Sequence, residues 1–100
     1  MKQIALHFDL DVTIVEVPEL IADNIEYYRK LFDNWISDKS NNHGHWYIVN
    51  GEKKGVFCDS QTVIDFWNQI VLKKSKEKVR VLKKQKYGDA IPCEMPILYF

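Results

Sequence analysis

The chain has 100 residues, of which 46% are hydrophobic and 28% are charged, and its formal net charge is zero. This composition excludes an intrinsically disordered chain, and no apolar run approaches the ~20 residues that a membrane-spanning helix needs. A chain of this length is expected to form one domain, residues 1–100, around a single hydrophobic core.

Charge is distributed unevenly between the two halves of the chain. Residues 1–50 carry eight acidic and four basic side chains, whereas residues 51–100 carry six acidic and ten basic ones. This asymmetry indicates charged partners, or halves that attract each other within one chain or in a dimer.

The N-terminus lacks the apolar run of a signal peptide, and Cys58 and Cys93 lack metal-binding spacing. We therefore expect a cytoplasmic protein with reduced thiols.

Alternating apolar residues predict that the chain begins with a strand over residues 2–8. The alternation changes phase because Val15 and Val17 follow Ile14. A bulge or turn is therefore expected near residues 9–13, with a second extended piece over residues 12–16.

The longest periodic segment, residues 18–37, predicts one amphipathic helix. Pro18 suits its first turn, and Glu19 and Asp23 complement the positive end of the helix dipole. The apolar stripe expected to face the core consists of Ile21, Ile25, Tyr28, Phe32, Trp35 and Ile36.

The second half of the chain predicts a hairpin, a second helix and two further strands. An exposed loop over residues 37–45 leads into hairpin strands at 45–49 and 55–58, joined through Asn50-Gly51. Asp59 or Ser60 can cap a helix that ends near Leu72. Further strands are expected at 78–84 and 96–100, with a loop at 87–92 between them. Two helices and about five strands predict an α+β fold with a mainly antiparallel sheet.

Asp9, Asp11 and Thr13, in HFDLDVT, resemble the first motif of haloacid dehalogenase-like phosphatases. That resemblance implies a nucleophile at Asp9, a general acid/base at Asp11 and bound Mg²⁺. Val12 replaces the usual glycine, and the family needs a longer parallel core. We favour an acidic strand end over a catalytic site.

Two other patterns resemble binding sites. His43 and His45 flank a glycine, but two histidines do not complete a metal site, so no metal or cofactor is expected. Residues 73–86 hold eight basic side chains and one acidic one, which makes a small nucleic-acid-binding module the alternative function. The segment has no interleaved aromatics for base stacking, and lysines commonly protect sheet edges, so nucleic acid is the less favoured partner.

The outward face of the 18–37 helix and the loop after it form the more promising surface. It combines acidic side chains with an exposed tyrosine and a tryptophan, which suits docking to a basic protein. The residues expected to bind a partner are Asp23, Glu26, Tyr27, Asp33, Asn34, Asp38, His43, His45 and Trp46.

The chain as a whole resembles the small bacterial immunity proteins encoded beside polymorphic toxins, including those of contact-dependent growth inhibition. The resemblance is carried by residues 16–40, by the loop and hairpin at 41–60, by the tryptophan-bearing second helix and by the terminal PILYF. It implies a non-enzymatic cytoplasmic inhibitor that occludes the active site of its cognate toxin. Many such toxins are nucleases, whose basic clefts complement an acidic patch.

Overall fold

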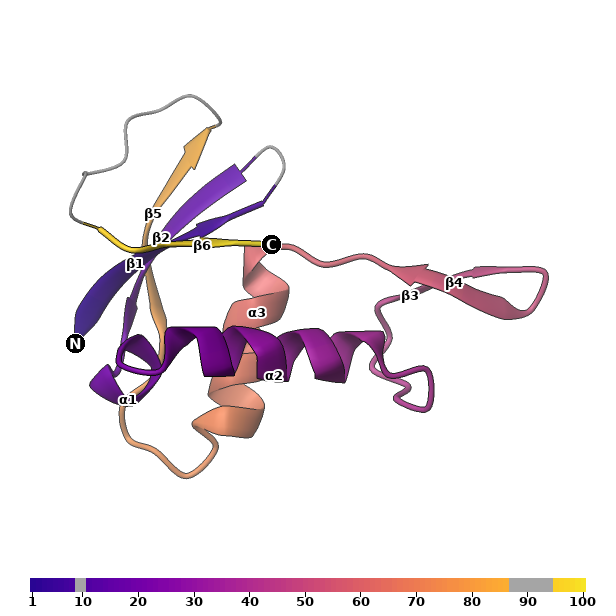
Figure 1. Cartoon of the computed structure of the whole chain (residues 1–100), viewed down its shortest axis with the longest axis horizontal. Coiled ribbons are helices and arrows are strands. Elements are labelled where there is room, and N and C mark those ends of the chain that lie inside the picture. The colour runs from indigo at the N-terminus through magenta and orange to yellow at the C-terminus, as the bar shows by residue number, and fades with distance from the viewer. Residues whose placement is uncertain (9–10, 87–94) are drawn as a thin grey trace.

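The structure, a computed structural model, describes residues 1–8, 11–86 and 95–100. Four strands form a mixed sheet in the order β5-β2-β1-β6 (Figure 1). Their bounds are β1 Lys2–His7, β2 Asp11–Val17, β5 Arg80–Lys86 and β6 Ile97–Tyr99. The β1–β2 and β2–β5 pairs are antiparallel, whereas β6 runs parallel to β1.

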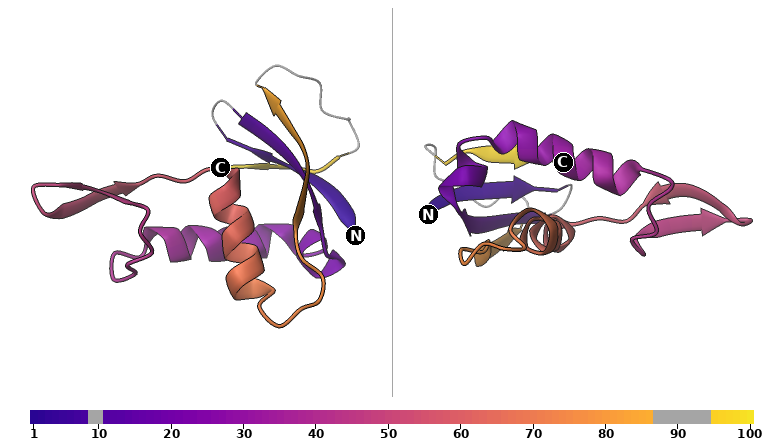
Figure 2. Two further views of the ribbon diagram at one scale, coloured as in Figure 1. Left: turned by 180° about the vertical axis from the view of Figure 1, so that it is seen from behind. Right: turned by 90° about the horizontal axis from the view of Figure 1, so that it is seen from below.

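Helices cover one face of this sheet, and a separate hairpin extends away from it (Figure 1). The helices are α1 Glu19–Ala22, α2 Ile25–Ser37 and α3 Ser60–Phe66, and α3 continues into a π-helical turn, η1 Trp67–Val71. The hairpin strands are β3 Trp46–Val49 and β4 Glu52–Val56. Figure 2 shows the same hairpin from behind and from below, standing clear of the sheet in both views. We call residues 46–56 the arm.

The core lies between the sheet and the two longer helices. Trp67 and Phe32 are its largest fully buried side chains, and they pack with inner-face residues of β1 and β2 such as Leu6 and Val15. The indole Nε1 of Trp67 donates to the Tyr28 carbonyl oxygen at 3.3 Å, which joins η1 to α2. The predicted stripe of the 18–37 segment is therefore confirmed as the core-facing side.

The α+β class is confirmed, and the sheet is mainly antiparallel as expected, but it has four strands and not about five, and its β6 strand is parallel to β1. The chain end returns beside β1 in the parallel direction, with the Phe100 N–H donating to the His7 carbonyl oxygen at 3.0 Å. Side-chain alternation fixes which face of a strand is buried but not the direction of its neighbour. The arm forms a second sheet of two strands.

The single helix expected over residues 18–37 is two helices, because the backbone breaks at Asn24. This residue has φ −133° and ψ 40°, and its side-chain amide donates to the Leu20 carbonyl oxygen at 3.0 Å. Asp and Asn have low helix propensity and favour helix ends, which explains a break at Asp23-Asn24. The amphipathic pattern continues through the break, so periodicity alone does not reveal it.

Phe8 and Asp11, which flank the turn expected between the first two strands, exchange paired backbone bonds, and residues 9 and 10 lie outside the described residues. The change of phase in β2 has a further cause, because both faces of this strand are buried. Val15 packs under the helices, while Val12 and Ile14 form a small cluster with Ala5 on the opposite face.

The remaining elements shift by a few residues from their predicted bounds. Asp59 caps α3 and shares a capping box with Thr62, and the second helical segment ends before Leu72 as expected. The strand predicted at 78–84 lies at Arg80–Lys86. The loop predicted at 87–92 lies outside the described residues.

Candidate functional site

The outer face of α2 presents the centre of the predicted acidic surface. Tyr27 is 61% exposed, and the Glu26 side chain is 74% exposed. Arg29 lies between two carboxylates, with its Nε 3.2 Å from Glu26 and its Nη1 3.5 Å from Asp33. Asn34 is exposed on the next turn. Because the opposite side of α2 packs into the core, these groups sit on a fixed scaffold.

Asp23 lies outside α2, at the C-terminal end of α1. Its carboxylate accepts a hydrogen bond from the Lys2 ammonium at 2.7 Å. This hydrogen bond and the attraction between the two charges raise the pKa of Lys2 above its ordinary value. Both side chains are more than half exposed, so the pair remains accessible to a partner.

Asp38 organises the turn that follows α2. Its carboxylate accepts from the Ser40 hydroxyl at 2.7 Å and from the Ser40 N–H at 3.0 Å. These two bonds, the hydroxyl first, lower the pKa of Asp38. Asp38 therefore contributes charge to the surface and also fixes the start of the 38–45 loop.

The histidines and the tryptophan predicted as partner contacts form an aromatic cluster at the base of the arm. The rings of His43 and Trp46 stack with centroids 5.0 Å apart and planes 15° apart, and Trp35 of α2 packs on His43 at 4.9 Å. His45 lies 5.3 Å from His43, ring to ring. All four side chains are half-buried, so they connect the arm to α2 and contribute only part of their surface outward.

Hydrogen bonds fix the orientation of this cluster. His43 Nε2 donates to the Ile36 carbonyl oxygen at 2.8 Å, and its Nδ1 accepts from the His45 N–H at 3.0 Å, which is the pattern of a neutral ring. The Trp46 indole donates to the Asn41 carbonyl oxygen at 2.6 Å. The Lys53 ammonium sits 5.2 Å from the Trp46 ring centroid.

The structure adds a surface that the sequence interpretation missed, the apolar side chains of the arm. Ile48 is 58% exposed and Tyr47 45%, while Phe57, just beyond the arm, is 70% exposed. Tyr47 lies over Gly55, where an added Cβ would stand 3.4 Å from the ring. The sequence does contain a signal for this surface, because the uncharged strand Trp46–Val49 pairs with a strand that carries lysines.

A shallow depression of about 540 Å³ lies between α3 and the residues that flank the base of the arm. His45, Cys58, Asp59 and Asp65 are among its lining residues. Partial burial, and then the charge of Asp59, raise the pKa of the Cys58 thiol. Among residues 1–8, 11–86 and 95–100, no group of three or more His, Cys, Asp or Glu side chains is placed to hold a metal ion.

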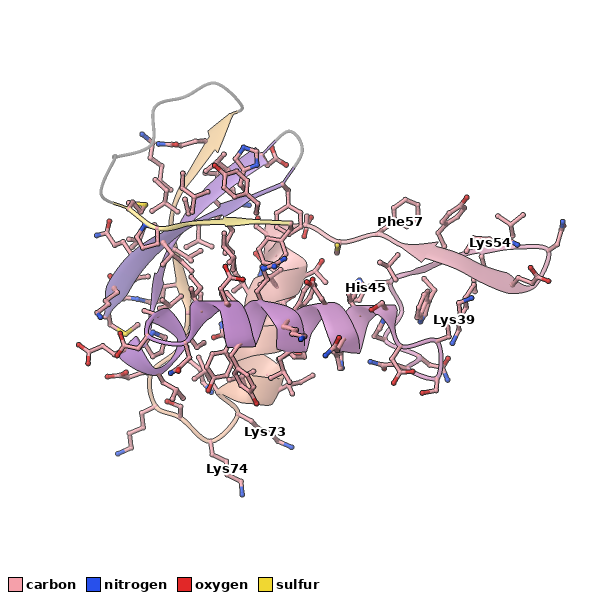
Figure 3. The ribbon with its side chains drawn as sticks, viewed as in Figure 1. Lys39, His45, Lys54, Phe57, Lys73 and Lys74 are labelled. Carbon is pink, nitrogen blue, oxygen red and sulfur yellow. The ribbon has the colours of Figure 1, made fainter. Side chains whose placement is uncertain are left out.

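The described side chains of the basic segment 73–86 come from two parts of the fold, the turn after η1 and strand β5. Lys73 and Lys74 project outward where the chain leaves the helical segment (Figure 3). Lys78 donates to the Leu72 carbonyl oxygen, and Arg80 pairs with Glu16 at 3.0 Å. These two side chains are thus engaged within the fold.

The phosphatase-like pattern can be followed only in part, because Asp9 lies outside the described residues. Asp11 is exposed at the start of β2. The strand before this pair is joined to β2 in an antiparallel hairpin, whereas the phosphatase motif follows a strand of a parallel sheet.

No family model, curated protein or solved structure matches this chain. Within the described residues, none of the helices has the length and apolar character needed to cross a bilayer.

Proposed function

We propose that this chain is a non-enzymatic immunity protein that binds a cognate bacterial toxin in the cytoplasm and neutralises it by covering its active site. The observation that supports the proposal is the exposed surface around α2, where Tyr27 is accessible and the carboxylates of Asp23, Glu26, Asp33 and Asp38 lie among Arg29 and Lys30. We call this surface the acidic face of α2, after its carboxylates. A tyrosine on a rigid helix is an effective contact residue because it loses little conformational entropy on binding. Surrounding carboxylates favour encounter with a basic protein.

The loop after α2 extends this surface without loss of rigidity. Asp38 is held by Ser40, and His43 is hydrogen-bonded to α2 and stacked on Trp46. A preorganised loop binds with a smaller entropic cost than a flexible one. The helix face and the loop together therefore suit a contact that covers a basic cleft, such as that of a nuclease.

The test is capture of the partner with the tagged protein from the source cells, including the product of the neighbouring gene. The proposal expects one stoichiometric basic protein, whose toxicity in cells is abolished when this chain is co-expressed. Recovery of RNA or DNA in its place would favour the alternative, a nucleic-acid-binding module that uses the lysines of residues 73–86. Such binding would weaken steeply as salt rises.

A variant pair assigns the surface once a partner is captured. The triple reversal Asp23→Lys, Glu26→Lys and Asp33→Lys changes exposed charges outside the core and should weaken capture. The matched control, Lys73→Glu, Lys74→Glu and Lys76→Glu, reverses three exposed charges in the turn that follows η1 and should leave capture intact.

A further inference from the structure

The arm is a two-stranded ribbon whose outer edges have no strand partner among the described residues. Isolated two-stranded hairpins are marginally stable in water, and a third strand or a packed face normally completes them. At its base the arm is fixed by the Trp46 cluster and by the Phe57 N–H, which donates to the His45 carbonyl oxygen at 2.8 Å. Beyond the base, the strands project away from the sheet and helices (Figures 1 and 2).

The two edges of the arm differ in charge. The β4 edge carries Glu52, Lys53 and Lys54, the kind of charged edge that deters strand addition. The β3 edge, Trp46–Val49, carries no charge and consists of aromatic and β-branched residues, which favour strand pairing. The β3 edge is therefore the open one.

Backbone geometry identifies the groups that this edge offers. The His45 carbonyl faces β4, because it accepts from Phe57. The register shift between Tyr47 and Ile48 leaves the extra residue, Lys54, on β4, so inward and outward groups still alternate along β3 and the N–H and C=O of Ile48 point away from β4. The Ile48 side chain is 58% exposed, so this position is accessible to a partner.

We infer that the β3 edge pairs antiparallel with the β3 edge of a second copy of this chain, across a two-fold axis at Ile48. Each Ile48 N–H then donates to the Ile48 carbonyl oxygen of the other copy, and the two arms become one four-stranded sheet. Tyr47 of one copy comes to lie opposite Val49 of the other, which places apolar side chains 45% and 39% exposed in the free chain against each other.

The absence of charge on β3 favours a second copy of this chain as the partner of the β3 edge. Because β3 is uncharged, self-pairing brings no like charges together, whereas pairing through β4 about Lys53 would set the two Lys53 side chains opposite each other. The chain's formal net charge of zero also removes long-range repulsion between copies. A two-fold contact needs only one self-complementary patch, and the β3 edge is such a patch. The acidic face of α2 stays outside this contact, so the inference is independent of the proposed function.

The test is sedimentation equilibrium of the full chain across a wide range of protein concentration. The contact is small, so a weak dimer is expected, populated at concentrations on the order of 100 µM. Ile48→Lys would set two lysines opposite each other at the axis and should weaken the dimer about tenfold or more. Leu20→Lys is the matched control, since Leu20 is similarly exposed, at 55%, but lies on α1, and it should leave the dimer intact.

Amide hydrogen exchange gives a second readout that a change in folding would not imitate. Exchange of the Ile48 N–H should slow as protein concentration rises, while the inward-facing Tyr47 N–H should not respond. A chain that is monomeric at every concentration overturns the inference. So does a dimer that survives Ile48→Lys, or a monomer whose captured partner is lost on Ile48→Lys, because the edge would then belong to that partner.

Discussion

Replacing Trp46 with alanine should release the arm while leaving the rest of the fold intact. The indole stacks on His43 at 5.0 Å, lies under the Lys53 ammonium at 5.2 Å and donates to the Asn41 carbonyl oxygen at 2.6 Å. Such contacts contribute about 0.5–1.5, 0.5–1 and 0.5–1.5 kcal/mol respectively. Their loss therefore removes about 1.5–4 kcal/mol of local stability, which is enough to open a two-stranded ribbon.

Hydrogen exchange followed by mass spectrometry measures this loss segment by segment. Peptides from residues 46–56 should lose protection in Trp46→Ala, while peptides that contain Trp67 should keep theirs, because Trp67 lies in the main core. Trp46→Phe retains the stacking and loses the indole hydrogen bond, so its effect should be intermediate. Uniform loss of protection across the whole chain would refute the view that the arm is a separately anchored element.

Three further outcomes follow from individual contacts. The side-chain amide of Asn68 bonds both backbone groups of buried Val79, at 3.1 and 2.8 Å. Asn68→Ala should therefore lower the free energy of unfolding in urea by about 2–4 kcal/mol. An unchanged urea midpoint would contradict this role. Gly51 has φ +79° in the arm turn, so Gly51→Ala should destabilise the arm by about 1–2 kcal/mol, seen as faster exchange of residues 46–56, whereas equal exchange in both proteins would exclude strain there. The pKa of Asp38 is lowered by Ser40, so the loop is stabilised above the unfolded-state pKa and loses that contribution as pH falls through the lower folded-state value. The Ser40 amide resonance should accordingly titrate with a midpoint below 3.8, the ordinary pKa of an aspartate. This titration should be lost in Asp38→Asn. A midpoint at or above 3.8 would contradict the hydrogen bonds of this turn.

Local sequence signals predicted those parts of the fold that depend on local chemistry. The stripe through Phe32 and Ile36 is buried, Asp59 caps α3, and Asn50-Gly51 forms the arm turn with positive φ at both residues. Each outcome depends on residues within one or two turns of one another, which is the range over which periodicity and turn preferences act.

The features that could not be predicted depend on distant contacts. The parallel direction of β6 follows from its pairing beside β1, and the position of the arm follows from the Trp46 cluster. The break at Asn24 lies inside an unbroken amphipathic pattern, so only backbone geometry reveals it.

The residues of the candidate surface fall into the same two groups, those predicted from local sequence and those whose role depends on tertiary contacts. Glu26, Tyr27 and Asn34 are exposed on α2, where helical periodicity placed them. His43 and Trp46 instead fix the base of the arm through stacking and backbone bonds, roles that sequence spacing does not indicate.

The most direct test of partner binding through the acidic face of α2 is the affinity of the captured partner for matched charge variants, measured by titration calorimetry at low and physiological salt. Reversal of Asp23, Glu26 and Asp33 to lysine should weaken binding about tenfold or more and reduce its salt dependence. Reversal of Lys73, Lys74 and Lys76 to glutamate should leave the affinity unchanged. Full affinity in the first variant and loss of affinity in the second would contradict the acidic-face proposal and assign binding to the lysine segment.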